Sequence, residues 1–178
     1  TASNAMMGAH QAGASNLDKL FSSWGIKMAE KAVAGDLGTA KKVQFNRGAR
    51  PVVIDYPIWF EIRPEQMASD DVITGNLSQI TMASPGILSK QDKAEIEFVS
   101  LLKTSSQGST IPVDRLGPFM QPQDLLRGYQ SDGEHTLAAR VRGKVKTAFP
   151  DGKPKPSEDV APNPENLPKD DQPHVTEA

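Results

Sequence analysis

A strict alternation of apolar and polar side chains marks the clearest element of the chain, in the stretch PVVIDYPIWFEIRP. Apolar side chains occupy every second position there, at Val52, Ile54, Tyr56, Ile58, Phe60 and Ile62. A period of two that is rich in β-branched and aromatic residues predicts a β-strand over 52–62. Because Pro57 has no backbone N–H, we expect the strand to be bent, bulged or at a sheet edge at that position.

The same period predicts three more strands, at 77–84, 95–102 and 137–149. One face of the last strand carries small and apolar residues, and the other carries Arg140, Arg142, Lys144 and Lys146. A strand with one charged face is typical of an antiparallel sheet or of a sheet edge.

A helical period appears near the start of the chain. Four apolar residues recur there at the spacing of one helix face, namely Leu17, Leu20, Phe21 and Trp24. Ser15 can cap the first turn, and Gly25 stands where a left-handed residue commonly ends a helix. We therefore predict a short amphipathic helix over 16–24, and a helical turn over 123–129.

The segments between these elements are less regular. Residues 25–36 fit either a strand or a helix, and residues 36–50 indicate an exposed loop with a short strand at 42–45. Pro85 and Gly86 predict a tight turn, in which proline sets the second position and glycine takes a positive φ at the third.

The last part of the chain differs in composition from the rest. Residues 151–178 contain six prolines and seven acidic residues against three lysines, a net charge of −4, which leaves about +2 on residues 1–150. Such a segment buries too little apolar surface to offset its ordering entropy. We expect a lead-in over 1–14, with Ser3-Asn4-Ala5 as the remnant of a cleaved tag, one α/β domain over 15–150, and a linker or tail over 151–178.

The composition of the chain excludes several kinds of functional site. The chain has no cysteine, which excludes disulfides, thiolate zinc sites and cysteine nucleophiles. The three histidines are scattered, and His135 beside Glu134 fits a surface turn better than a catalytic cleft. No run approaches the roughly 18–20 apolar residues of a membrane span. We predict no metal site, no cofactor and no enzymatic activity.

The stretch LLKTSSQGST, residues 101–110, carries the strongest candidate chemistry. Lys103, Thr104, Ser105 and Ser106 follow an apolar run, yet they match neither a phosphate-binding P-loop nor a Gly-x-Ser-x-Gly nucleophile turn. They fit a polar turn after a buried strand or a loop that contacts a small anion or carbohydrate. A small-molecule hydrolase or transferase that uses Lys103–Ser106 stays open as an alternative function.

The charged strand and one tryptophan offer a second group of candidates. Four cations at alternate positions suit a polyanion, but no aromatic residues are interleaved to stack on bases, so we expect no nucleic acid. The face also fits a solvated strand, a protected edge or a partner surface. Trp59 shares its side of the strand with Asp55 and Glu61, which is compatible with an interface anchor or with the cover of a second apolar layer.

Five stretches in this order resemble one protein family. They are SNLDKLFSSWGIKM, PVVIDYPIWFEI, NLSQITMASPGIL, FVSLLKTSSQGS and LAARVRGKVKTAFP. Together, over residues 14–150, they resemble the auxiliary component of uncharacterised ABC transport systems, a family related to gliding-motility-associated transporter proteins. Each motif is short, and it is their order and spacing that carry the resemblance.

The resemblance implies a fold and a function. The fold is α/β, with a mixed, partly antiparallel sheet and few flanking helices, similar to part of a glutamine-amidotransferase-like or flavodoxin-like sandwich. The function is that of a non-enzymatic accessory domain, for substrate handling or assembly, beside an ABC permease and its ATPase.

The same resemblance implies a location and a context. It places the domain on the periplasmic, extracytoplasmic side of the inner membrane, in a membrane-anchored subunit. Both anchors and the first units of the family domain are missing, so we expect a fragment whose open sheet edge pairs with a second copy. Residues 151–178 would then lead toward a membrane segment.

Overall fold

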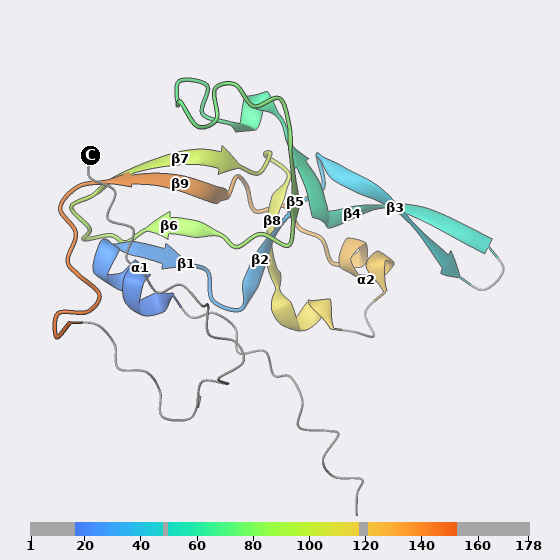
Figure 1. The fold of residues 1–178 in the computed structure, drawn as a ribbon. Helices are drawn as coiled ribbons and strands as arrows, with labels where there is room; N and C mark the ends of the chain where they lie inside the picture. The colour runs from blue at the N-terminus through green and yellow to red at the C-terminus, as the bar shows by residue number, and fades with distance from the viewer. Residues whose placement is uncertain (1–16, 48–49, 118–120, 153–178) are drawn as a thin grey trace, which may run out of the picture. The chain divides into compact units, whose positions relative to one another are not determined.

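The fold is built from antiparallel ladders with two short α-helices, as Figure 1 shows. The structure is a computed structural model that describes residues 17–47, 50–117 and 121–152. Every ladder between its named strands is antiparallel. The predicted α/β class with an antiparallel sheet is confirmed, whereas the likeness to a glutamine-amidotransferase-like or flavodoxin-like sandwich stays a prediction.

The described strands form three sheets. The largest has the order β1-β6-β9-β7, with the bounds Ile26–Met28, Leu88–Lys90, Thr136–Arg142 and Glu97–Lys103. The second has the order β3-β4-β5, with the bounds Ala40–Arg47, Arg50–Ile62 and Ile80–Ala83. The third pairs β2 with β8, with the bounds Ala32–Asp36 and Gly108–Pro112.

The described residues also form four short helical segments, of which α1 precedes the first strand and the others lie between strands. The α-helices are α1 (Asp18–Trp24) and α2 (Pro122–Arg127), and the 3₁₀ turns are η1 (Pro64–Gln66) and η2 (Val113–Leu116). The helical turn predicted over 123–129 is confirmed by α2. In α2, Pro122 occupies the first turn, where its missing N–H leaves no hydrogen bond unmade.

Strand β4 confirms the alternation in its sequence. Ile58, Phe60 and Ile62 are buried on one side, while Trp59 between them is exposed. The pairing with β3 shifts where Ala40 faces Phe60 but Lys41 faces Tyr56, so residues 57–59 form a bulge. The irregularity expected at Pro57 is therefore present.

Two apolar clusters hold the sheets together. The larger is centred on the buried side chains Phe60, Ile62, Met67, Leu101 and Leu102. The smaller joins Ile58, Ile111 and Leu125, from β4, β8 and α2. Burying one such side chain contributes about 1.5–3 kcal/mol, so the contacts between sheets stabilise the fold more than any helix does by itself.

A shift of register explains why two successive leucines are both buried. A regular strand would point Leu101 and Leu102 to opposite faces. The ladder between β7 and β9 is irregular between Ser100 and Leu102, and again between Leu102 and Lys103. Both leucines therefore join the larger cluster.

Several predicted boundaries are wrong. Residues 36–50 are not a loop, because β3 runs from Ala40 to Arg47, and residues 108–112 form an unpredicted strand. The positive φ of the turn near residue 85 belongs to Ser84 (φ 49°) and not to Gly86. The last strand ends at Arg142, because Gly143 adopts φ 136° and turns the chain out of the ladder.

Helix α1 is close to its prediction. It begins at Asp18, while the proposed cap Ser15 lies outside the described residues. Gly25 ends the helix in the left-handed conformation, with φ 73°, and its N–H bonds back to the last turn. A Cβ at this position would collide with the Cβ of Ala94, so Gly25 is required by conformation and by packing.

We predict that Gly25→Ala destabilises the protein by at least about 1 kcal/mol, because an L-residue is strained in the left-handed region and its methyl group meets Ala94. Gly117→Ala is the control, since Gly117 has φ −64° and open space around it. The free energy of unfolding, from urea denaturation, measures both. Equal effects of the two substitutions would contradict this role of Gly25.

Candidate functional site

The stretch LLKTSSQGST joins two sheets, because it contains the end of β7, a four-residue loop and the start of β8. Thr104 is only 1% exposed. Its backbone N–H donates to the carbonyl oxygen of His135 over 3.0 Å, and its Oγ1 accepts from the N–H of His135 over 2.8 Å. The threonine hydroxyl thus extends the pairing of β7 with the chain that enters β9.

Ser105 is held by a buried carboxylate on β2. Asp36 is fully buried, and its Oδ1 accepts from the Ser105 hydroxyl over 2.7 Å, while its Oδ2 accepts from the Ser105 N–H over 2.5 Å. Oδ1 also accepts from the N–H groups of Gly38 (2.9 Å) and Thr39 (3.3 Å), and Gln66 Nε2 lies 3.5 Å from Oδ2. Hydrogen bonds to an ionised acceptor are stronger than those between neutral groups. These donors therefore compensate Asp36 for the water that it loses on burial.

Tyr129 holds the far end of the loop. Its hydroxyl accepts from the N–H of Leu37 over 3.1 Å and donates to the carbonyl of Gln107 over 2.5 Å. Burial raises the pKa of Tyr129 above its ordinary value, and repulsion from Asp36 and Asp132 raises it further. The hydrogen bond from the Leu37 N–H lowers this pKa, but by less. The phenol therefore stays protonated at neutral pH and remains a donor to the loop.

Asp132 and His135 form a further part of the hydrogen-bond network around the loop. Asp132 Oδ1 lies 2.6 Å from His135 Nε2, and Asp132 Oδ2 accepts from the Thr110 N–H over 3.2 Å. Partial burial raises the pKa of Asp132, but the hydrogen bonds from His135 and Thr110 outweigh it, so that the net shift is downward. The side chain of His135 is only 15% exposed. It is therefore less accessible than the surface turn we expected.

The predicted loop residues do not gather in one cavity. A pocket of about 190 Å³ lies beside the loop and is lined by Glu65, Gln66, Met67, Ala68, Ser100, Lys103, Thr104 and Glu134. Lys103 and Glu134 form a half-exposed ion pair of 3.4 Å at this pocket. Neither Ser105 nor Ser106 lines it. Lys103 and Thr104 thus lie at this pocket, whereas Ser105 is bonded to Asp36.

The predicted row of cations is not one strand face, and this expectation is corrected. Arg140 forms an ion pair of 2.6 Å with Asp71, and both side chains are mostly buried. Arg142 is exposed and pairs in register with Glu97 of β7. Lys144 and Lys146 lie beyond the end of β9, after the turn at Gly143.

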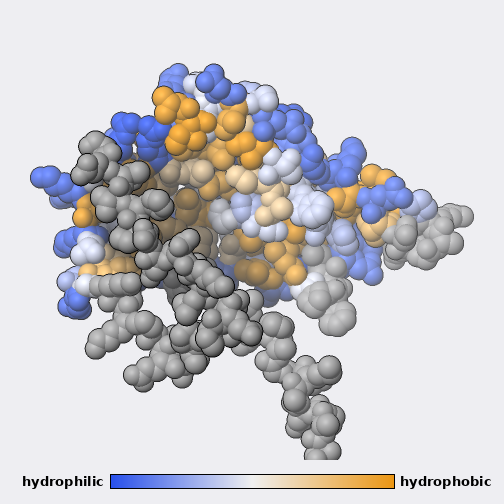
Figure 2. Space-filling model, viewed as in Figure 1, coloured by the Kyte–Doolittle hydropathy of each residue, from blue (hydrophilic) through white to orange (hydrophobic). Residues whose placement is uncertain are grey.

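Trp59 is half-exposed, at 47%, and its ring meets Tyr56 edge to face, with 5.9 Å between ring centroids. This geometry is compatible with an interface anchor. Exposed apolar side chains also gather in the loop after η1, where Val72 is 86% and Ile73 60% exposed. Figure 2 shows hydrophobic surface beside hydrophilic surface at the top of the view, where the loop after η1 lies in Figure 1.

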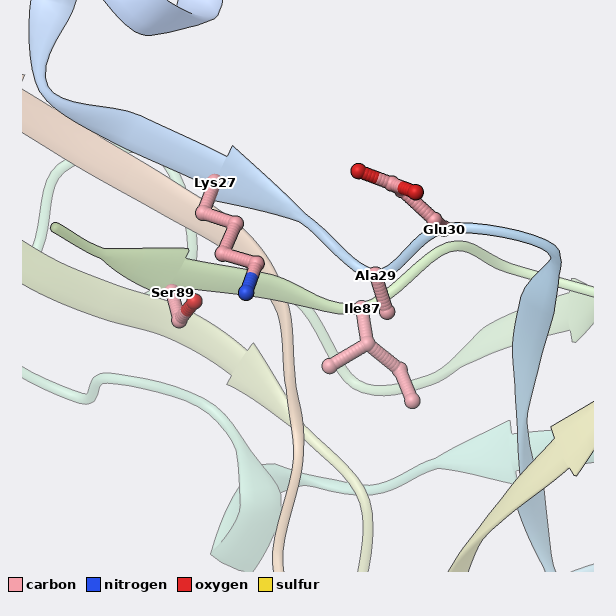
Figure 3. Close-up of a pocket in the computed structure, with 5 residues that line it drawn as sticks. All are labelled: Lys27, Ala29, Glu30, Ile87 and Ser89. Atoms are coloured by element: carbon pink, nitrogen blue, oxygen red, sulfur yellow. The ribbon is translucent and has the colours of Figure 1, made fainter.

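A further pocket of about 460 Å³ lies along the ladder between β1 and β6 (Figure 3). Lys27 and Ser89 are register partners there, and Figure 3 shows the lysine side chain extending toward the serine. Glu30 and two apolar side chains complete the lining. None of the residues proposed from the sequence contributes to it.

The described residues contain neither a cluster of metal ligands nor a membrane-spanning helix. Within residues 17–47, 50–117 and 121–152 no three His, Asp or Glu side chains come together as metal ligands would. No helix in these ranges has the length and apolar character needed to cross a bilayer.

Comparison with known proteins gives one match. A family model described as "ABC-type uncharacterized transport system" matches residues 1–175. No curated protein and no solved structure matches the chain. The resemblance first seen in five short motifs is therefore supported over almost the whole sequence.

We predict that Asp36→Asn destabilises the fold by about 2–4 kcal/mol, because an amide NH₂ would face backbone donors that now meet a carboxylate oxygen. Asp55→Asn, which removes the exposed ion pair with Lys42, should cost less than about 1 kcal/mol. Urea denaturation of both variants measures the difference. A stable Asp36→Asn protein would show that the carboxylate is not what holds the loop.

Proposed function

The chain belongs to the family of ABC-type uncharacterized transport systems, and on that premise we propose that it is a non-enzymatic accessory domain of such a system. In this role it handles the transported substrate or helps to assemble the transporter. Its partners are the permease and ATPase subunits of the same system.

One observation carries the non-enzymatic part of the proposal, namely that the hydroxyls of Thr104 and Ser105 are used in internal hydrogen bonds. Ser105 Oγ donates to Asp36, and Thr104 Oγ1 accepts from His135. A serine nucleophile needs a base beside it and a substrate in reach. The base nearest Ser105 is Asp36, which is fully buried and surrounded by other donors.

The surface offers two places for partners. Trp59 is a large, half-exposed aromatic side chain, and such residues dominate the binding energy of many interfaces. Strands β1 and β7 are the outer strands of the four-stranded sheet, and β3 and β5 those of the three-stranded sheet. We propose Trp59 as a contact to another subunit and an open strand edge as the contact to a second copy.

The proposal includes a location. The domain lies on the periplasmic side, in a membrane-anchored subunit of a system related to gliding motility. Its sheets are similar to those of a glutamine-amidotransferase-like or flavodoxin-like sandwich. The family match supports the connection to transport, and the finer points rest on the resemblance of the motifs.

We predict that the full-length subunit, tagged in its native membrane, co-purifies with an ABC permease and ATPase. Trp59→Ala should lower the recovery of these subunits about tenfold or more, because it removes a candidate anchor. Val53→Ala is the matched control, since Val53 is a 57% exposed apolar residue of the same strand. Mass spectrometry of the purified material quantifies the subunits.

The outcomes separate the parts of this proposal. Recovery of the subunit without permease and ATPase would contradict the accessory role. Equal losses for Trp59→Ala and Val53→Ala, or none for either, would remove Trp59 as the contact and leave the role intact.

The extracytoplasmic location is tested by labelling, because the chain has no cysteine. With Ser106→Cys, on the exposed loop, we expect a membrane-impermeant maleimide to label the subunit in cells whose inner membrane is intact. Ala34→Cys, fully buried, should stay unlabelled until the protein is denatured. Labelling of Ser106→Cys only after the inner membrane is broken would place the domain in the cytoplasm.

A further inference from the structure

A third cavity lies at the end of α1, away from the Asp36 network. It has a volume of about 490 Å³ and lies between the last residues of α1, the turn 91–96 and the segment 144–147. We call it the Trp24 pocket, after the aromatic residue in its lining. A volume of this size is within the range of small-molecule sites in proteins.

The walls of the Trp24 pocket are fixed by the backbone. Gly25 packs directly on Ala94, and the carbonyl of Gly25 accepts from the Gln91 N–H over 2.9 Å. On the other side, Gly143 turns the chain with φ 136°, and the buried Ala148 holds the far end of the segment 144–147. The left-handed Gly25, the turn at Gly143 and the buried Ala148 thus position the ends of the segments that line the cavity.

The charge of the pocket is positive. Its ionisable lining residues are Lys93, Lys144 and Lys146 against Glu95, a net charge of +2 at neutral pH. None of the ion pairs formed by the described residues includes any of the three lysines. Three such ammonium groups around one cavity attract an anion.

The C-terminal end of α1 does not cancel the attraction of the pocket for an anion. Carbonyl groups at the end of a helix carry partial negative charge. Here the carbonyl of Leu20 accepts from Ser23 Oγ over 2.9 Å, and the Gly25 N–H caps the carbonyls of Phe21 and Ser22. These oxygens are therefore satisfied within the helix.

Trp24 gives the pocket an apolar wall. Its side chain remains 37% exposed although the indole is a large apolar group. A smaller adjoining pocket of about 140 Å³ shares Trp24 and Val145 with the first one and adds Arg142. Val145 is itself 43% exposed. A flat ring can stack on an exposed indole while an attached anionic group meets the lysines.

We propose that the Trp24 pocket binds a small organic anion with a planar ring, an aromatic phosphate or carboxylate. The lysines 93, 144 and 146 hold the anionic group, and Trp24 and Val145 hold the ring. The site shares no residue with the Asp36 network and does not include Trp59, so its test does not depend on the subunit contacts proposed above.

Tryptophan fluorescence tests this proposal with phenyl phosphate as the probe. The chain has two tryptophans, so Trp59→Phe leaves Trp24 as the only one. In this background we expect a saturable change in fluorescence with phenyl phosphate, and weaker binding as the salt concentration rises. Benzoate, inorganic phosphate and benzyl alcohol are the comparison ligands, and the last two should bind more weakly because each lacks one half of the recognised group.

Substitution of the lysines provides the second measurement. Lys144→Gln and Lys146→Gln should each weaken phenyl phosphate binding about two- to fivefold, and the double variant about tenfold, because exposed charge pairs contribute up to about 1 kcal/mol each. Lys42→Gln, on β3, is the control and should leave the affinity unchanged. Both pocket lysines are exposed, so the melting temperature should stay constant.

Three results would overturn the proposal. The first is the absence of a saturable change with phenyl phosphate and with benzoate. The second is equal binding of inorganic phosphate, which would leave Trp24 without a role in recognition. The third is an equal effect of Lys42→Gln and Lys144→Gln, which would indicate attraction to the overall charge and not to this pocket.

Discussion

The fold depends on one fully buried carboxylate, Asp36, and on the donors that surround it. Through Ser105 it holds the connection between β7 and β8, and through Gly38 and Thr39 it orders the turn into β3. The Asp36 side chain thus links all three sheets at one point. Burying a charge without hydrogen-bond partners would cost folding free energy. The fold is therefore stable only when the donors around Asp36 keep these positions.

This constraint changes the meaning of the hydroxyl-rich loop. Thr104 and Ser105 carry the residue types of a ligand loop, but their hydroxyls complete the pairing with His135 and Asp36. Lys103, which directly precedes them, remains half-exposed at a small polar pocket. The loop therefore connects β7 to β8 through buried hydrogen bonds, and Lys103 pairs with Glu134 at its edge.

Local patterns predicted local structure well and distant contacts poorly. The alternation in β4 and the glycine after α1 were sufficient to predict a strand and a helix end. Each of these patterns depends only on the conformation of neighbouring residues. Asp36 precedes Gly38 by two residues, which is a visible turn signal, but its bond to Ser105 joins positions 69 apart in sequence. The alternation of charged residues continues to Lys146 and therefore predicted a strand that is too long. The ladder ends earlier, because the backbone turns at Gly143.

The hairpin of β3 and β4 has a property that follows from its pairing. Strand β5 joins β4 only at residues 59–62, so residues 50–55 of β4 have hydrogen bonds to β3 alone among the named strands (Figure 1). An isolated two-stranded ribbon is marginally stable in water. The outer half of this hairpin can therefore open while the three-sheet core stays closed, and its amide protons would exchange with solvent long before those of β7 and β9.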